Sequence, residues 1–99
     1  MKVRFTWEAR EDLLRIGDAI AQDSPSRAID FVRQLRRRAR KIGDMPLAFP
    51  VVPRFEAASI RRCVFRNYLI FDQAGYDAVT IVHILHGARD HEAILSSDG

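Results

Sequence analysis

The sequence predicts a single α+β domain in which a two-helix antiparallel hairpin packs on a mainly antiparallel sheet. Three observations predict it: an alternating N-terminal segment, two apolar seams at helical spacing, and three runs of β-branched and aromatic residues after a proline-rich loop. A chain of 99 residues buries enough surface for one core. We therefore expect one domain over residues 1–99, with an N-terminal strand, the helical hairpin and three C-terminal strands in that order.

The first strand is expected over residues 2–6. In "KVRFTW" apolar and polar residues alternate, which is the period of a half-buried strand. Thr6 has a side chain that accepts hydrogen bonds from the free amides of a following helix, so the first helix is expected at about residues 7–22. Trp7 stands among apolar residues, and we expect it in the core.

Two amphipathic helices follow the strand. In the first, apolar residues recur at helical spacing: Ala9, Leu13, Ile16 and Ile20. Ser24 suits the cap of the second helix and Pro25 its first turn. Its seam continues up to Gly43, which is expected to end the helix, and consists of Ala28, Val32, Leu35, Ala39 and Ile42. The short break between the helices predicts an antiparallel hairpin, and Phe31 is assigned to its core.

A loop and three strands complete the expected fold. Three prolines within eight residues make residues 43–59 a connecting loop. Three runs, "IRRCVF", "YLIFD" and "AVTIVHILH", predict consecutive antiparallel strands over residues 60–65, 68–72 and 78–86. Arg66 and Asn67 fit a tight hairpin turn, and Gly75 is expected to supply a positive φ in the next turn. Asp72 is expected to face solvent at a strand end.

The composition is that of an ordinary soluble globular protein, with 47% hydrophobic and 29% charged residues. No apolar run approaches the roughly 20 residues that span a bilayer, so we expect no membrane association and a cytoplasmic location. The single cysteine, Cys63, is interpreted as a small buried thiol. Without a Cys/His array at zinc-site spacing, we expect neither a metal nor a cofactor. The final "SSDG" is expected to fray.

Positive charge is concentrated in the second helix. Residues 27–41 hold seven Lys or Arg against one acid, Asp30. Such a face suits a nucleic acid, a ribosome or an acidic protein partner, although an arginine-rich helix face is also commonly just solvated.

The helical segment "AREDLLRIGDAIAQDSPSRAIDFVRQL" and the C-terminal segments "IRRCVFRNYLIFD" and "VTIVHILHGARDHEAIL" together resemble the RelE/ParE superfamily of toxin–antitoxin toxins. The resemblance covers nearly the whole chain, and "ILHGARD" is its most specific part. It implies the toxin component of a type II system, neutralised by a cognate, ParD-like antitoxin. Acidic side chains of that antitoxin are then expected to meet four arginines of the second helix: Arg33, Arg36, Arg37 and Arg40.

Two activities occur in this superfamily. RelE-type members cut mRNA on the ribosome with Lys and Arg residues and commonly a C-terminal tyrosine, whereas ParE-type members act on DNA gyrase. The functional arginines correspond here to Arg61 or Arg62 and to Arg89. Leu95 stands where the tyrosine would be, and "RFEAAS" lacks the paired lysines of RelE-type sites. The resemblance therefore implies a ParE-like gyrase inhibitor without catalytic residues, in which these three arginines contact the target.

The alternative is a RelE-like ribosome-dependent endoribonuclease, and a third reading is a module that only binds an antitoxin. The catalytic candidates of the nuclease would be Arg61, Arg62, Arg89, His86 and His91. The two histidines suit acid–base work, because imidazole takes and gives a proton near neutral pH.

Arg89 has two readings of about equal weight. It either contacts a target, or it braces the strand end by pairing with Asp90, with Glu92 or with a carboxylate of the first helix. His83, which alternates with Ile84, is expected to be a structural, hydrogen-bonded sheet residue.

Overall fold

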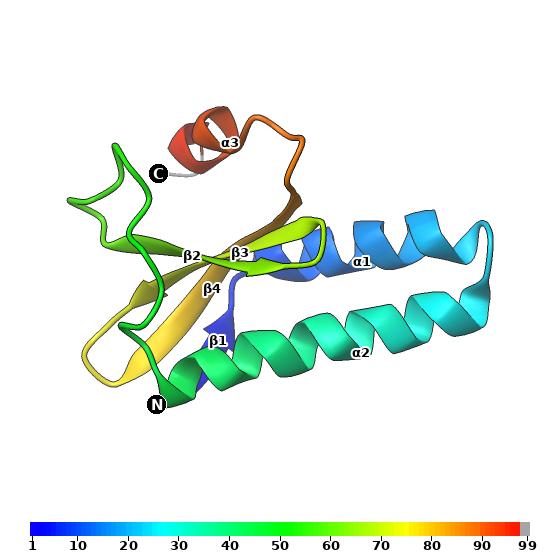
Figure 1. Cartoon of the computed structure of the whole chain (residues 1–99), viewed down its shortest axis with the longest axis horizontal. Coiled ribbons are helices and arrows are strands. Elements are labelled where there is room, and N and C mark those ends of the chain that lie inside the picture. Colours follow the sequence, from blue (N-terminus) through cyan, green and yellow to red (C-terminus); the bar gives the residue numbers. More distant parts are fainter. Residues whose placement is uncertain (98–99) are drawn as a thin grey trace.

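The computed structural model describes residues 1–97 and contains four strands, three α-helices and one 3₁₀ turn (Figure 1). Their order is β1 (Lys2–Phe5), α1 (Trp7–Ala21), α2 (Pro25–Lys41), η1 (Ile42–Asp44), β2 (Ile60–Phe65), β3 (Tyr68–Ala74), β4 (Ala78–His86) and α3 (His91–Ser97). The predicted order of strand, two helices and three strands is confirmed. The short helix α3 was not predicted.

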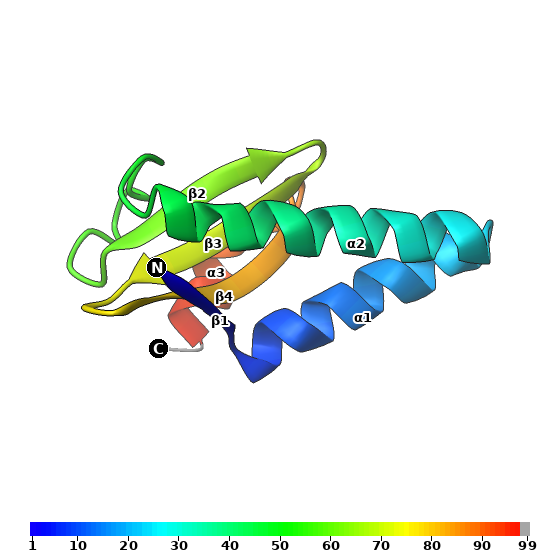
Figure 2. The ribbon, with the colours of Figure 1, turned by 90° about the horizontal axis from the view of Figure 1, so that it is seen from below.

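The four strands form one mixed sheet in the order β1-β4-β3-β2. β2, β3 and β4 are antiparallel neighbours, and β1 pairs with β4 in parallel. The helical hairpin makes the crossover between β1 and the other strands, and it extends well beyond the sheet (Figures 1 and 2). No helix within residues 1–97 is both long and apolar enough to cross a membrane.

Caps fix both helix starts where the sequence predicts them. The Thr6 hydroxyl accepts a hydrogen bond from the Ala9 amide and donates one to the Val82 carbonyl, 2.9 Å away, so it also ties α1 to β4. Ser24 accepts from the amide of Arg27, and Pro25 opens α2. Gly43 does not end α2, because the helix stops at Lys41 and tightens into the 3₁₀ turn.

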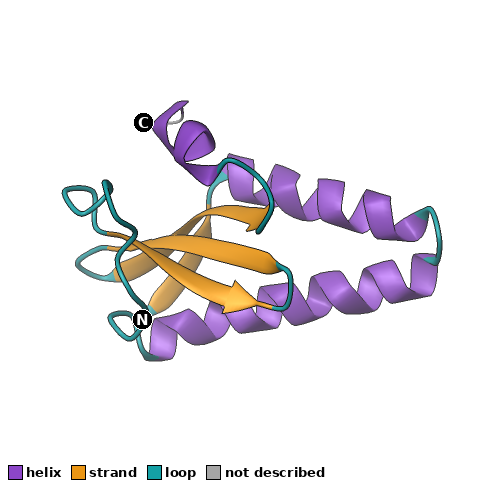
Figure 3. Ribbon diagram, turned by 45° about the horizontal axis from the view of Figure 1, so that its top comes forward, coloured by secondary structure: helices purple, strands orange, loops and turns teal. Residues whose placement is uncertain are grey.

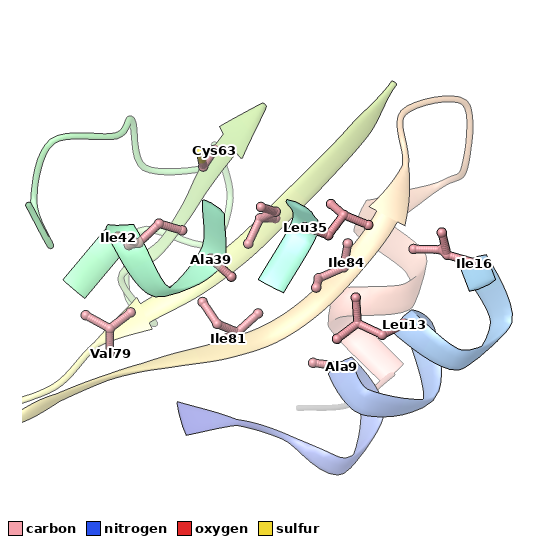
Figure 4. Close-up of a cluster of buried hydrophobic side chains, with 11 residues drawn as sticks. Ala9, Leu13, Ile16, Leu35, Ala39, Ile42, Cys63, Val79, Ile81 and Ile84 are labelled. Carbon is pink, nitrogen blue, oxygen red and sulfur yellow. The ribbon is translucent and has the colours of Figure 1, made fainter. Parts of the chain in front are cut away.

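The larger core lies between the helical hairpin and one face of the sheet (Figure 4). The seams of α1 and α2 supply Leu13, Ile16, Leu35 and Ala39, and the strands supply Cys63, Ile70, Val79, Ile81 and Ile84. The buried Cys63 thiol and the helix seams agree with the sequence interpretation. Phe31 is half-buried and packs at the margin of this core.

A second core covers the other face of the sheet. It joins Val52 of the loop, Ile60, Leu69, Phe71 and Leu85 of the strands, and Leu95 of α3. Helix α3 therefore lies on the opposite side of the sheet from the hairpin, as Figure 1 shows. Figure 3 draws the helices in purple and the strands between them in orange. Leu95, which the sequence comparison with RelE-type toxins treats as a missing tyrosine, is a core residue here.

Two expectations about burial are wrong. Trp7 is 71% exposed, because the strand ends at Phe5 and Trp7 opens α1, so the period of two no longer sets its direction. Asp72 is fully buried, because β3 continues to Ala74 and has strands on both sides.

The expectation about the backbone of Gly75 is also wrong. No glycine within the described residues has a positive φ, and Gly75 instead donates its amide to the Ala78 carbonyl. The left-handed positions are Arg54, Ser59 and Arg66. Ser96 and Ser97 of the final "SSDG" belong to α3, whereas residues 98–99 lie outside the described residues.

Candidate functional site: an arginine-lined helical hairpin and the open end of the sheet

The four arginines assigned to antitoxin binding share one exposed stripe of α2. Arg33, Arg36, Arg37 and Arg40 stand at positions i, i+3, i+4 and i+7, which lie on one side of a helix. The guanidinium of Arg40 lies 5.5 Å from the centre of the Phe5 ring. The stripe therefore presents a row of positive charge along the hairpin and away from the core.

An apolar groove runs between α1 and α2 beside this stripe. It encloses about 420 Å³ and is lined by apolar residues of both helices, with Arg33 and Arg36 at its margin. Leu14 and Ile29 line it although they are 68% and 56% exposed. A Cβ added at Gly17 would stand 3.3 Å from a methyl group of Val32. Because glycine has no such atom, the two helices can approach closely at this point. The hairpin thus carries an apolar surface with a basic margin.

Strand β2 places Arg61 and Arg62 on opposite faces of the sheet, because successive side chains of a strand alternate. Arg62 lies opposite Phe71 of β3 in the register of the two strands, on the α3 side of the sheet. Arg61 lies opposite Asp72 of β3 in the register of the two strands, on the hairpin side of the sheet. Its Nη1 donates to the Phe49 carbonyl, 2.7 Å away. Arg61 therefore fastens the loop of residues 45–59, a role the sequence did not indicate.

Asp72 is the unexpected ionisable group of this region. Burial raises the pKa of its carboxyl from the ordinary 3.8 to about 6, and the positive charge of Arg61 lowers it in part. Neither carboxyl oxygen has a hydrogen-bond partner within the described part of the chain, and the same holds for Nε of Arg61. The pair is close enough for an electrostatic effect but forms no hydrogen-bonded ion pair.

Arg89 lies in an exposed turn beyond β4. Gly87 donates its amide to the Asn67 carbonyl, and the Arg89 amide donates to the carbonyl of His86. None of the ion pairs within residues 1–97 includes Arg89, and Glu92, one of its expected partners, pairs with Arg54 instead. Bracing by an ion pair, one of the two alternatives for Arg89, is therefore not seen in the described structure, and Arg89 lines a hollow of about 170 Å³.

The two histidines that flank Arg89 are not brought together. The His86 ring meets Tyr68 edge-on at 5.3 Å, on the hairpin side of the sheet. The His91 ring lies 5.6 Å from Phe71, on the α3 side. The sheet separates them, so they form no acid–base pair.

A buried Asp12–His83 contact joins α1 to β4. The two side chains approach to 2.6 Å, between Oδ2 of Asp12 and Nδ1 of His83, and the same oxygen accepts from the Ile84 amide at 2.9 Å. β1 pairs with β4 only as far as Ile81, and Asp12 accepts the hydrogen bond of a β4 amide beyond this point, at Ile84. His83 has the structural role expected of it. The sequence signal for Asp12 is an acid at helical spacing from Ala9 and Ile16, on the apolar face of α1.

Tyr68 is a further residue that the sequence reasoning missed. It borders the hollow beside Arg89 and also a second one, of about 310 Å³, next to α2. Arginines from four segments line these two hollows, namely Arg15, Arg27, Arg66 and Arg89. Because these arginines are far apart in the sequence, local motifs could not predict that they lie together.

Comparison with known proteins adds family and fold. Residues 3–91 match a family model described as "ParE toxin of type II toxin-antitoxin system, parDE". A solved structure titled "Chromosomal ParDE TA system from P. aeruginosa" is similar with a TM-score of 0.73 and 16% identity, over 87% of this chain and 95% of that one. At this identity the likeness shows a shared fold. No curated protein matches the chain.

Proposed function

Because the chain belongs to the ParE toxin family of type II toxin–antitoxin systems, we propose that it inhibits DNA gyrase and is neutralised by a cognate antitoxin. The observation that carries this proposal is the family match over nearly the whole chain, residues 3–91. The proposed action is binding to the target, without a chemical step on RNA.

The dispersion of the nuclease candidates supports this choice over the RelE-like alternative. Cleavage of a phosphodiester needs acid–base groups and cations that converge within a few ångströms of one phosphate. Arg61 and Arg62 lie on opposite faces of the sheet, and so do His86 and His91. Leu95 lies on the buried side of α3 and offers neither a proton nor a stacking surface. Of these candidates, only His86 and Arg89 line one hollow within the described residues, and the second histidine does not join them there.

The hairpin groove is the proposed antitoxin site. An amphipathic helix fits such a groove with apolar side chains at i, i+3 and i+4. Exposed Leu14 and Ile29 would be covered by it, and acidic side chains would meet the arginine stripe of α2. A segment that orders on binding loses conformational entropy, which burial of the apolar groove would offset.

Arg89 is the proposed contact to gyrase. Its guanidinium is exposed and engaged in no ion pair within residues 1–97, so its fork is available for a carboxylate or a phosphate. Arg62 is half-buried on the α3 side, and Arg61 holds a loop carbonyl. Of the three arginines assigned to the target, Arg89 is therefore the one we propose as the principal contact.

Two parallel assays test the proposal. Purified full-length protein, freed of antitoxin, is added to a gyrase supercoiling reaction and to a translation reaction in which ribosome-bound mRNA is inspected for cuts. We expect supercoiling to stop and the mRNA to remain intact. Cut mRNA with unaffected gyrase would replace the proposal by the RelE-like activity. Normal growth of cells that express soluble protein without antitoxin would leave only a binding module.

A further inference from the structure

Two hollows flank Tyr68 at the end of the sheet that carries the β2–β3 turn. The larger, of about 310 Å³, lies between α2 and the turn and is lined by Arg27, Asp30, Phe31, Gln34, Arg66 and Asn67, besides Ile20 and Tyr68. The smaller, of about 170 Å³, lies between α1 and the end of β4 and includes Arg15, His86 and Arg89. We call these two hollows together the Tyr68 cleft. It shares no residue with the apolar groove of the hairpin.

The charge of the Tyr68 cleft is positive. Four arginines line it, and its acids are Asp30 and Asp12. Asp12 is 4% exposed and is already engaged by His83, by the Ile84 amide and by the Arg15 guanidinium 3.7 Å away, so it offers little negative charge to a ligand. A cleft with this balance attracts anions, and arginine forks suit phosphate oxygens in particular.

Arg66 occupies a backbone position that favours glycine. Its φ is +54°, at the first of the two residues that connect β2 to β3. In such turns a residue other than glycine holds a strained backbone conformation. The guanidinium lies 6.0 Å from the Phe31 ring and 5.6 Å from the Phe65 ring, and it donates to Oε1 of Gln34. It is thereby held at the margin of the larger hollow, with further N–H groups left for a ligand.

An aromatic surface stands between the arginines. The Tyr68 ring packs 5.5 Å from Phe31 and 5.3 Å from His86, and it remains partly exposed. Arginines beside an aromatic ring match a nucleotide, whose phosphate binds the guanidinium while its base stacks on the ring. The two hollows are small and concave, so they suit a strand with unpaired bases. A duplex is read by a convex helix or ribbon that enters its groove.

We propose that the Tyr68 cleft binds single-stranded nucleic acid, with Arg27 and Arg66 on one phosphate group, Arg15 and Arg89 on the next, and Tyr68 beside an unpaired base. This binding goes beyond gyrase inhibition and does not require it. Arg89 is common to the two proposals, so the test relies on Arg27 and Arg66.

Fluorescence anisotropy on the full chain, freed of antitoxin, tests the proposal. The probes are fluorescein-labelled oligothymidylate and oligouridylate of about 16 nucleotides, which covers the site of one small domain, and a mixed-sequence DNA duplex of equal length. We expect either single strand to bind more tightly than the duplex. The tighter of the two identifies DNA or RNA as the preferred strand.

The decisive variant combines Arg27→Ala and Arg66→Gly. Glycine suits the positive φ at position 66, so the melting temperature should hold or rise while two charges leave the cleft. We expect affinity for the single strand to fall at least about tenfold, and the slope of log K against log salt to fall by about 0.7, the value for the one phosphate contact that the two arginines share.

A matched control has the same change of charge outside the cleft. Arg10→Ala with Arg54→Gly removes one arginine from α1 and another from a positive φ of 74°, and neither residue borders the Tyr68 cleft. It should bind like the unchanged protein. The proposal is overturned by no binding, by equal or tighter binding of the duplex, or by an equal loss in the control. It is also overturned if the decisive variant loses only antitoxin affinity.

Discussion

The carboxyl group of Asp72 is fully buried, and neither of its oxygens finds a hydrogen-bond partner within residues 1–97. Its pKa rises to about 6 because burial disfavours the charged form. The folded protein therefore holds this proton at a pH where the unfolded chain has released it. The contribution of this bound proton to the free energy of unfolding is fully present below about pH 4 and is lost as the pH rises through about 6. The loss amounts to roughly 3 kcal/mol, at about 1.4 kcal/mol per pKa unit.

Asp72→Asn tests this linkage. The amide imitates the protonated carboxyl, so the variant should be more stable than the unchanged protein at pH 8 by about 1–3 kcal/mol and similar to it at pH 4. Thermal melts from pH 4 to 8 measure the difference in stability. The two proteins contain the same histidines, so the effect of histidine titration on stability cancels in this difference. Asp77→Asn, at an exposed turn, should show no such divergence. Parallel curves for Asp72→Asn would contradict the buried carboxyl.

Arg89→Ala should abolish growth arrest while the melting temperature and antitoxin affinity change little. The reason is that the side chain is exposed and its guanidinium makes no ion pair in the described structure, so its removal breaks no internal contact. Growth after induction, thermal melts and antitoxin titration measure the three quantities. Arg89→Lys keeps the charge but loses the fork, and it should be intermediate. A loss of stability of about 1 kcal/mol or more would indicate a brace.

His86→Gln combined with His91→Gln should leave growth arrest in place. The two rings lie on opposite sides of the sheet, and gyrase inhibition asks no proton transfer of them. Growth arrest and mRNA cleavage on ribosomes are measured for a variant shown to fold. A folded but harmless variant, with cleavage by the unchanged protein, would favour the nuclease.

At the scale of elements, the helical hairpin has two working sides. One side packs on the sheet through Leu13, Ile16, Leu35 and Ala39. The other carries the apolar groove and the arginine stripe. The two caps at Thr6 and Ser24 fix where each helix begins, and hence which side each residue faces. A helix that is apolar on one face and both apolar and basic on another is suited to a second partner.

Replacing Arg33, Arg36, Arg37 and Arg40 together by alanine should weaken antitoxin binding. The arginines are exposed, and alanine favours a helix, so the fold should persist. At low salt the affinity should fall by about tenfold or more, mainly through slower association, and the two proteins should converge as salt screens the charges. Association kinetics at several salt concentrations measure this. An unchanged affinity at low salt would remove the stripe from the antitoxin site.

At the scale of the molecule, the sheet is buried on both faces, by the hairpin and by α3 with the loop. β1 covers the edge of β4 only as far as Ile81, and Asp12 continues the bonding at Ile84. The N-terminal ammonium donates to the Gly43 carbonyl at 2.8 Å, which closes the start of β1 onto the end of the hairpin. The two layers are therefore joined by specific polar contacts besides their shared core.

Asp12→Ala tests the bond that joins the hairpin to the sheet. It leaves the buried Ile84 amide without its acceptor and removes the Asp12 contact of His83, which should cost about 2–4 kcal/mol. The melting temperature of a chain this size should fall by about 10 °C or more. Asp18→Ala, on the exposed side of the same helix, is the control and should change little. An equal effect at the two positions would contradict the assigned bond.

The elements and their order could be predicted from local patterns of residues. Helix caps, apolar periods of 3.6 and 2, and proline positions act within a few residues, so α1, α2, β2 and β4 begin or end close to where the sequence predicts. The apolar seams of the helices also identified most of the larger core. The sequence did not predict helix α3, because seven residues are too few to establish a helical period and its apolar run is only Ala93, Ile94 and Leu95.

The environment of each polar side chain, in contrast, depends on how distant segments pack together in the fold. Asp72 is buried because β2 and β4 flank β3, and Asp12 meets His83 across 71 positions of the chain. The fold also brings arginines from four segments that are distant in the sequence to the two hollows beside Tyr68. Burial and charge depend on which distant residues come within a few ångströms, and a local pattern of residue types contains no information about those distances.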